Sequence, residues 1–165
     1  MLEQRTLTLT NNQIKIICEY FAQQLQADGI DATYSYLCFK NYTTLAPLYN
    51  NIISSLYDEK LDAEFIKFKN DDSILRTQYA ERDANGNVKF DSAGVPIITT
   101  NIETYKQKFN ELIEKYKTAL EERQRKIQNS YKLLNDTTSV DVLTLKVSEF
   151  PNSIIPLVVG TFGIE

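Results

Sequence analysis

Residues 82–101, RDANGNVKFDSAGVPIITTN, constrain the fold of this chain more than any other segment. The segment is polar and holds two turn signals, Asn85–Gly86 and Ser92–Ala93–Gly94. It lies between residues 45–81 and residues 102–134, where apolar side chains recur every three or four positions, as on one face of a helix. We therefore expect residues 82–101 to be the tip of a long antiparallel helical hairpin, folded as a small β-hairpin or an ordered loop.

Both arms of this hairpin are predicted as long helices. At a rise of about 1.5 Å per residue, each arm would span roughly 50 Å. Pro47 in the first arm predicts either a kink or the start of a helix, and Asp71–Asp72–Ser73 predicts a break or a new cap. In the second arm, acid-to-base pairs four residues apart, such as Glu111 and Lys115, are typical of an exposed helical face.

Short β elements are expected near both ends of the chain. Residues 6–10 alternate threonine with leucine, and residues 140–147 alternate apolar with polar side chains, which is typical of half-buried strands. We expect these two segments to pair at the base of the hairpin. A short helix capped by Asn11 or Asn12 should follow the first strand and end at Gly29. The predicted fold class is α+β, mostly α.

The composition fits one globular domain over residues 1–165. A net charge of −4 gives no reason to expect nucleic acid as the main partner. The longest apolar stretch, residues 154–159, is far shorter than the roughly 20 residues that cross a bilayer, and the N-terminus lacks the apolar core of a signal peptide. We expect no membrane association and a cytoplasmic location, with Cys18 and Cys38 as small buried hydrophobes rather than a redox pair.

No catalytic or cofactor-binding motif emerges from the sequence. The chain has no histidine, which excludes Ser-His and Cys-His nucleophile systems and histidine metal ligands. Asp83–Asn87 resembles the start of a calcium loop, but Val88 and Gly94 stand where such a loop needs Gly and Glu, so we expect a turn. The basic run Arg123–Lys126 has acidic neighbours and indicates a solvated helical face rather than a phosphate site. We expect no enzyme, metal or cofactor.

Two sets of residues are candidates for contact with a protein partner. Tyrosine suits surfaces that are apolar with a wet edge, so Tyr116 and Tyr131 are candidates, with ordinary packing at the edge of the core as the alternative. The apolar tail, residues 150–165, could be a short helix, a docking tail or a third strand. Its candidate partner-binding side chains are Phe150, Ile154, Ile155, Leu157, Val158 and Phe162.

Four segments carry a resemblance to a known family. They are LTLTNNQI at residues 7–14, LAPLYNNIISSL at 45–56, and QYAERDANGNVKFDSAGVPI at 78–97, which leads into YKQKFNELIE at 105–114. With the order of the predicted elements, they resemble a family of small, functionally uncharacterised bacteriophage proteins with a long helical hairpin and an acidic Asn-Gly tip. The resemblance covers most of the chain. It implies a phage-encoded protein and transfers no catalytic residue.

Together these features predict a non-enzymatic bacteriophage protein that acts through protein contacts, as a virion structural component or an assembly factor. Its partners would be further copies of itself or other phage proteins, in the host cytoplasm or within the virion. One alternative is a small phage protein that inhibits a host enzyme or defence factor, its acidic charge masking a basic surface. Another is an enzyme that uses carboxylates or Tyr and Lys groups, although no motif supplies a nucleophile, a base and an orienting group together.

Overall fold

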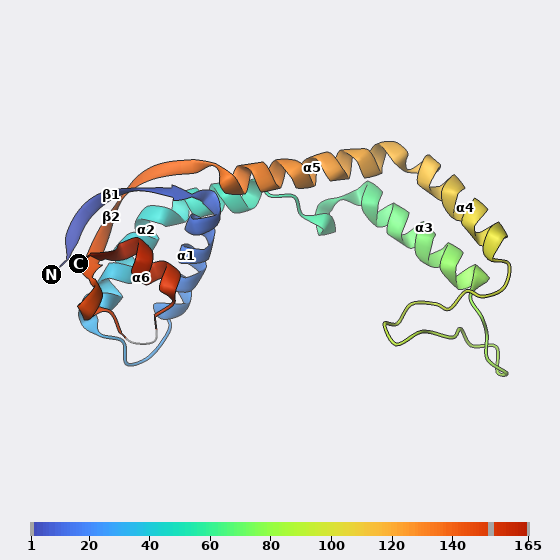
Figure 1. Cartoon of the computed structure of the whole chain (residues 1–165), viewed down its shortest axis with the longest axis horizontal. Helices are drawn as coiled ribbons and strands as arrows, with labels where there is room; N and C mark the ends of the chain where they lie inside the picture. The colour runs from blue at the N-terminus through green and yellow to red at the C-terminus, as the bar shows by residue number, and fades with distance from the viewer. Residues whose placement is uncertain (1, 152–153, 165) are drawn as a thin grey trace. The chain divides into compact units, whose positions relative to one another are not determined.

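The computed structural model of the chain describes residues 2–151 and 154–164. Within them the chain forms six α-helices and one three-stranded sheet, which confirms the α+β, mostly α, fold class. The elements in Figure 1 are, in chain order, β1 (Glu3–Thr10), α1 (Asn11–Gln24), α2 (Ala32–Ser55), η1 (Glu59–Leu61), α3 (Ala63–Tyr79), α4 (Ile102–Lys115), α5 (Lys117–Asn135), β2 (Thr137–Lys146), η2 (Val147–Glu149), α6 (Pro156–Phe162) and β3 (Gly163–Ile164).

The chain divides into two compact units. The first comprises Met1–Leu56 and Gln128–Glu165, and the second comprises Tyr57–Ile127. Helix α5 begins in the second unit and ends in the first.

The sheet of the first unit has the strand order β1-β2-β3. β1 and β2 pair antiparallel along the whole of β1, from Glu3 opposite Thr144 to Thr10 opposite Thr137, and they form the curved ribbon seen in Figure 1. This confirms the predicted pairing of the N- and C-terminal segments. β3 adds a short parallel pair, with Gly163 opposite Leu145.

Helix α1 begins one residue earlier than predicted. The sequence suggests Asn11 or Asn12 as the cap, but Thr10 is the N-cap: its hydroxyl accepts the Gln13 N–H at 3.1 Å. The Gln13 side chain accepts the Thr10 N–H at 2.8 Å, which completes a capping box. The prediction of an asparagine cap is therefore wrong, because the strand-ending threonine supplies the same acceptor. Asn11 instead donates from its side chain to the Leu133 carbonyl at 2.8 Å.

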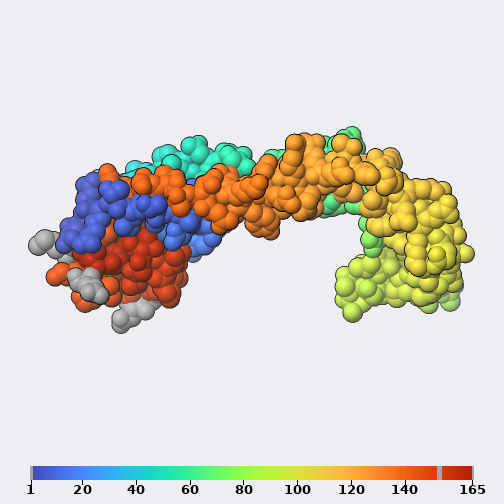
Figure 2. All heavy atoms as spheres, turned by 45° about the horizontal axis from the view of Figure 1, so that its top comes forward, coloured from blue at the N-terminus to red at the C-terminus, as the bar shows by residue number. Residues whose placement is uncertain are grey.

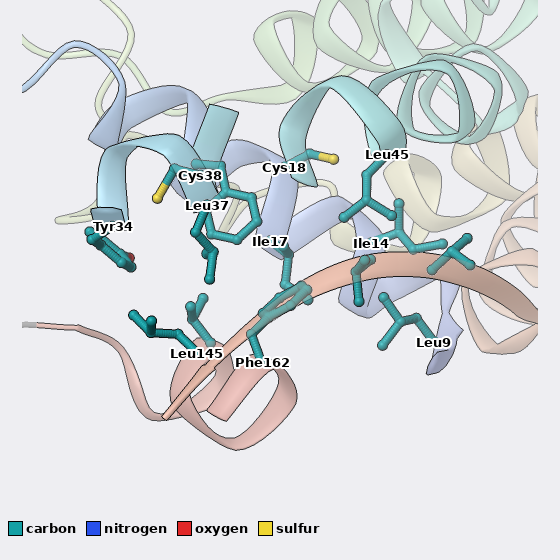
Figure 3. Packing of buried hydrophobic residues seen from close by; sticks show 14 of the residues in the cluster. Leu9, Ile14, Ile17, Cys18, Tyr34, Leu37, Cys38, Leu45, Leu145 and Phe162 are labelled. Carbon is teal, nitrogen blue, oxygen red and sulfur yellow. The ribbon is translucent and has the colours of Figure 1, made fainter. Parts of the chain in front are cut away.

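The core of the first unit forms where α1, α2 and α6 pack against the sheet. Figure 3 shows the side chains that meet there, with Phe162 of α6 among residues of α1 and α2. Cys18 and Cys38 lie free and buried in this cluster, which confirms their prediction as small buried hydrophobes. Pro47 lies inside α2, which continues through it from Ala32 to Ser55.

The predicted first arm, residues 45–81, is not one helix. Leu56 leaves the helical conformation with ψ 146°, and α3 starts only after Asp62. The reason is local capping. Asp58 accepts the Lys60 N–H at 2.9 Å and Asp62 accepts the Phe65 N–H at 3.1 Å, so each aspartate starts a new helical segment.

The break predicted at Asp71–Asp72–Ser73 is absent, and α3 continues through it. The side chains of Asp71 and Asp72 pair with Lys115 and Arg76, so they do not compete for backbone N–H groups. The second arm is also divided, since Tyr116, with φ −104° and ψ 10°, separates α4 from α5.

Candidate protein-contact surface

The second unit buries very little. Across residues 57–127, all of which the structure describes, only Leu112 and Tyr116 are buried. Both lie on the α4 side, where α3 and α4 pack side by side (Figure 1). A protein unit of this length normally has a core of its own. Here η1, α3, the tip, α4 and the first part of α5 share two buried side chains, so most of the unit is surface.

Aromatic side chains hold α3 and α4 together. Near one end of the pair, Tyr116 packs edge-on against Phe68 with ring centroids 5.7 Å apart, and its hydroxyl donates to Asp71 Oδ2 at 2.8 Å. Near the other end, Tyr79 of α3 packs against Tyr105 of α4 at 5.9 Å. Tyr116, a predicted partner contact, thus serves the internal packing of the unit.

A shallow groove of about 300 Å³ runs between the two helices. Its apolar lining is Ile74, Leu75 and Leu112. Leu112 is buried at the base, whereas Ile74 stands at the rim with 67% of its surface exposed. A half-open apolar groove beside a protruding isoleucine can receive an apolar side chain from another protein.

The rim of the groove carries two acids and two bases in two ion pairs. Lys115 donates to Asp71 and Lys108 donates to Glu111, each at 2.8 Å. The hydrogen bond from Lys115, followed by that from the Tyr116 hydroxyl, holds the pKa of Asp71 below its ordinary value. Lys108 likewise lowers the pKa of Glu111. The rim has no net charge, so it favours neither a strongly acidic nor a strongly basic partner.

The tip contains two turns of the same kind, each formed around an aspartate. The Asp83 carboxylate accepts the N–H groups of Asn85 at 2.8 Å and of Asn87 at 2.9 Å. Asp91 makes the same two bonds to the residues two and four positions later, both at 2.9 Å. The glycine three residues after each aspartate has a positive φ, 84° and 76°, which favours glycine. The prediction of turns is confirmed.

Three backbone hydrogen bonds close the tip into an ordered loop. Glu81 N–H donates to the Ile97 carbonyl at 2.7 Å, Ile97 N–H to Lys89 at 3.0 Å, and Lys89 N–H to Glu81 at 2.8 Å. Phe90 projects from this loop with 58% of its surface exposed. Figure 2 shows the tip, in yellow-green, gathered beside the yellow atoms of α4. The tip therefore presents an aromatic side chain on a backbone that is internally bonded.

The basic run at residues 123–126 is paired with acids. Arg123 donates to Glu59 at 3.1 Å and lies 4.0 Å over the Phe65 ring. Arg125 pairs with Glu122, and Lys126 with Asp62, both at 3.6 Å. These contacts agree with the predicted helical face, since the basic groups already have acidic partners.

The predicted partner-binding residues of the tail lie mostly in the core of the first unit. Val158 and Phe162 are fully buried and Phe150 is nearly so, while Ile154, Ile155 and Leu157 pack partly buried against the same cluster. The tail forms the short helix α6 and the strand β3; its residues 152–153 and 165 lie outside the described residues. These side chains serve the chain's own packing. Tyr131, by contrast, is 66% exposed on α5.

Sequence reasoning missed the most exposed apolar residues. Leu61 is 82% exposed, but it fits the helical periodicity of residues 45–81 and therefore looks like a core position. Ile74, which is 67% exposed, lies outside that apolar pattern and was not singled out. The duplicated aspartate turn could have been found from the recurring Asp-x-x-Gly spacing at Asp83 and Asp91.

No helix in the described ranges is long and apolar enough to cross a membrane. The same residues contain no group of three or more histidines, cysteines or acids placed to hold a metal ion. Comparisons with protein-family models, with curated protein sequences and with solved structures found no match to this chain.

Proposed function

We propose that this chain is a non-enzymatic bacteriophage protein that acts through protein–protein contacts, as a virion structural component or an assembly factor. It would work with further copies of itself or with other phage proteins, in the host cytoplasm or within the virion. The phage assignment comes from the sequence segments described above. The mode of action is supported by the surface of the second unit.

The observation that carries the proposal is the poor internal burial of Tyr57–Ile127. Only Leu112 and Tyr116 are buried there, while Leu61, Ile74 and Phe90 are each more than half exposed. Of these three, Ile74 lines the α3–α4 groove. Exposed apolar side chains beside a groove mark interaction sites, because covering them removes apolar area from water. At roughly 25 cal/mol per Å², covering a few large side chains supplies several kcal/mol toward binding.

The helix pair also has the features of a pre-formed recognition surface. Tyr116 links the two helices that line the groove, through its contacts with Phe68 and Asp71. Backbone hydrogen bonds order the tip. A surface that is already ordered loses little conformational freedom on binding. In this proposal, a partner helix lies in the α3–α4 groove, which is one of the recurring modes of protein recognition.

The test measures incorporation into phage particles. A phage that carries the wild-type gene should yield purified particles, or assembly intermediates, that contain the protein by quantitative mass spectrometry. Ile74→Lys places a charge at the rim of the groove and should lower incorporation at least ten-fold. Thr77→Lys adds the same charge on the same helix at an exposed position outside the groove lining, so it is the matched control.

Both variants should keep the wild-type circular dichroism spectrum, because neither side chain is buried. Absence of the wild-type protein from particles and from all assembly intermediates would overturn the structural and assembly roles. Equal incorporation of both variants would overturn the groove as the contact surface.

A further inference from the structure

The sheet of the first unit has one closed edge and one open edge. Beside β2, the Asn41 side chain of α2, which is 1% exposed, donates to the Leu143 carbonyl at 2.8 Å and accepts the Leu143 N–H at 2.7 Å. β3 then pairs with the end of β2 at Leu145 and Lys146. The opposite edge is β1, and no strand of the described residues lies on its outer side.

The contact with Asn41 identifies which backbone groups of β1 face outward. Leu143 lies opposite Gln4 and directs its N–H and C=O toward Asn41, away from β1. The Gln4–Leu143 pair is therefore not hydrogen-bonded. Because hydrogen-bonded and non-hydrogen-bonded pairs alternate in an antiparallel ladder, Gln4, Thr6 and Thr8 are the residues whose backbone groups point away from β2.

Side-chain contacts agree with this assignment. The Thr6 hydroxyl donates to the Asp141 carboxylate, and the Thr8 and Ser139 hydroxyls lie 3.2 Å apart. Non-hydrogen-bonded pairs bring opposite side chains closest together, as these contacts require. The outward N–H and C=O groups of Gln4, Thr6 and Thr8 have no partner among the described residues.

β1 also lacks the features that keep edge strands apart. Its sequence, EQRTLTLT, contains no proline, glycine or lysine, and its register with β2 continues without a bulge. Its two charged residues, Glu3 and Arg5, form an ion pair with each other at 3.1 Å. An eight-residue strand with a neutral, uninterrupted edge is a template for one more strand.

From these observations we infer that β1 pairs antiparallel with β1 of a second copy of this chain, which joins two three-stranded sheets into one across a two-fold axis. A two-fold contact needs a self-complementary surface. The outward residues of β1 are spaced symmetrically about Thr6, so Thr6 faces Thr6 of the second copy while Gln4 faces Thr8. In this register the outward N–H and C=O groups of Gln4, Thr6 and Thr8 in each copy are all hydrogen-bonded to the other copy.

The second copy fits this edge better than an unrelated strand. The outward N–H and C=O groups of each β1 can pair with the outward C=O and N–H groups of the other at the same spacing, and neither strand brings a net charge to the contact. The β1 edge belongs to the first unit and the α3–α4 groove to the second, so the inference goes beyond the contact surface of the proposed function. A negative result in the incorporation test would not affect the pairing of β1, and a monomeric chain would not affect the proposal for the groove.

The register makes a covalent test possible. Residues in a hydrogen-bonded antiparallel pair have Cα atoms about 5.5 Å apart, which lies within the range that a disulfide can bridge. In the Thr6→Cys variant, mild oxidation with a copper–phenanthroline catalyst should join the two new thiols across the axis, with loss of two protons and two electrons to dissolved oxygen. Ser139→Cys, on β2, is the matched control and should not cross-link. Cys18 and Cys38 are buried and should not interfere.

The non-covalent test uses sedimentation velocity of the full chain over a range of concentrations. The wild type should shift from 19.0 kDa toward twice that mass as concentration rises. Thr6→Lys puts like charges directly opposite across the axis and should raise the dimer dissociation constant up to roughly five-fold, whereas Ser139→Lys should leave it unchanged. A wild type that stays monomeric, a dimer indifferent to Thr6→Lys, or equal cross-linking of both cysteine variants would overturn the inference. Pairing of β1 only with another protein's strand would also overturn it.

Discussion

Replacing Phe162 by alanine tests whether the C-terminal tail belongs to the core. The Phe162 side chain is fully buried among the core residues (Figure 3). Its ring centroid lies 5.4 Å from that of Phe21. Truncating a buried phenylalanine to alanine costs about 3–5 kcal/mol through lost transfer free energy and the cavity left behind. The aromatic contact with Phe21 places the expected cost in the upper half of that range. Such a loss is a large part of the roughly 5–15 kcal/mol that stabilises a typical domain.

The two buried cysteines give an assay specific to this unit. Both thiols are buried, and burial raises the pKa of Cys18 to about 12 and that of Cys38 to about 11. We therefore expect neither to react with a thiol reagent until the core opens. A loss of about 3 kcal/mol raises the population of the open state roughly a hundred-fold. Phe162→Ala should therefore be labelled by a disulfide reagent at least that much faster than the wild type.

Tyr131→Ala provides the control, because Tyr131 is also an aromatic residue of the first unit but is largely exposed. Its free energy of unfolding should change by no more than about 0.5 kcal/mol, and its cysteine labelling should match the wild type. If Phe162→Ala does not fold, Phe162→Leu, with an expected cost of about 1.5 kcal/mol, gives the same comparison. Labelling of either Phe162 variant at the rate of Tyr131→Ala would refute the packing of α6 in the core.

Three further predictions concern single residues. Asn41→Leu leaves the N–H and C=O of Leu143 without a partner, so urea denaturation should show a loss of about 2 kcal/mol or more. The hydrogen bond from Lys115 holds the folded-state pKa of Asp71 below its ordinary value, so the stability that Asp71 contributes is present above the ordinary pKa and is lost as the pH falls through the folded pKa. Helicity should fall below about pH 4 in the wild type, and the fall should be smaller in Asp71→Asn, because other carboxylates with lowered pKa values, such as Glu111, still titrate there. Gly163→Ala should destabilise β3, because its Cβ would collide with the backbone of α6, and thermal melting should show a lower Tm.

The elements with strict local signals could be predicted from the sequence. The alternation in Thr6–Thr10 identifies β1, and the glycines at the tip identify its two turns, because each pattern follows from the backbone geometry of one short segment. The same local rules fail at helix ends. Asp58 and Asp62 act as caps, whereas Asp71 lies inside α3 and pairs with Lys115 of the neighbouring helix, and the sequence around these aspartates does not distinguish the two outcomes.

The contact surfaces were harder to predict because burial depends on tertiary packing. Phe162 and Ile74 are both large apolar residues in segments with mixed neighbours, yet one is fully buried and the other largely exposed. Periodicity gives the face of a helix on which a residue lies, but not whether another element covers that face. The role of Asn41 was equally hidden, since its partner Leu143 is distant in the sequence.

The weak burial of the second unit links its stability to binding. Its ion pairs, such as those of Lys115 and Lys108, are largely exposed, and exposed pairs contribute at most about 1 kcal/mol each. The α3–α4 pair therefore depends on a few apolar contacts around Leu112 and Tyr116. A partner that covers Ile74 would bind the folded unit and not the unfolded one, and such binding stabilises the fold by mass action. The side chains that leave the isolated unit weakly stabilised are thus the ones whose burial would drive the proposed association.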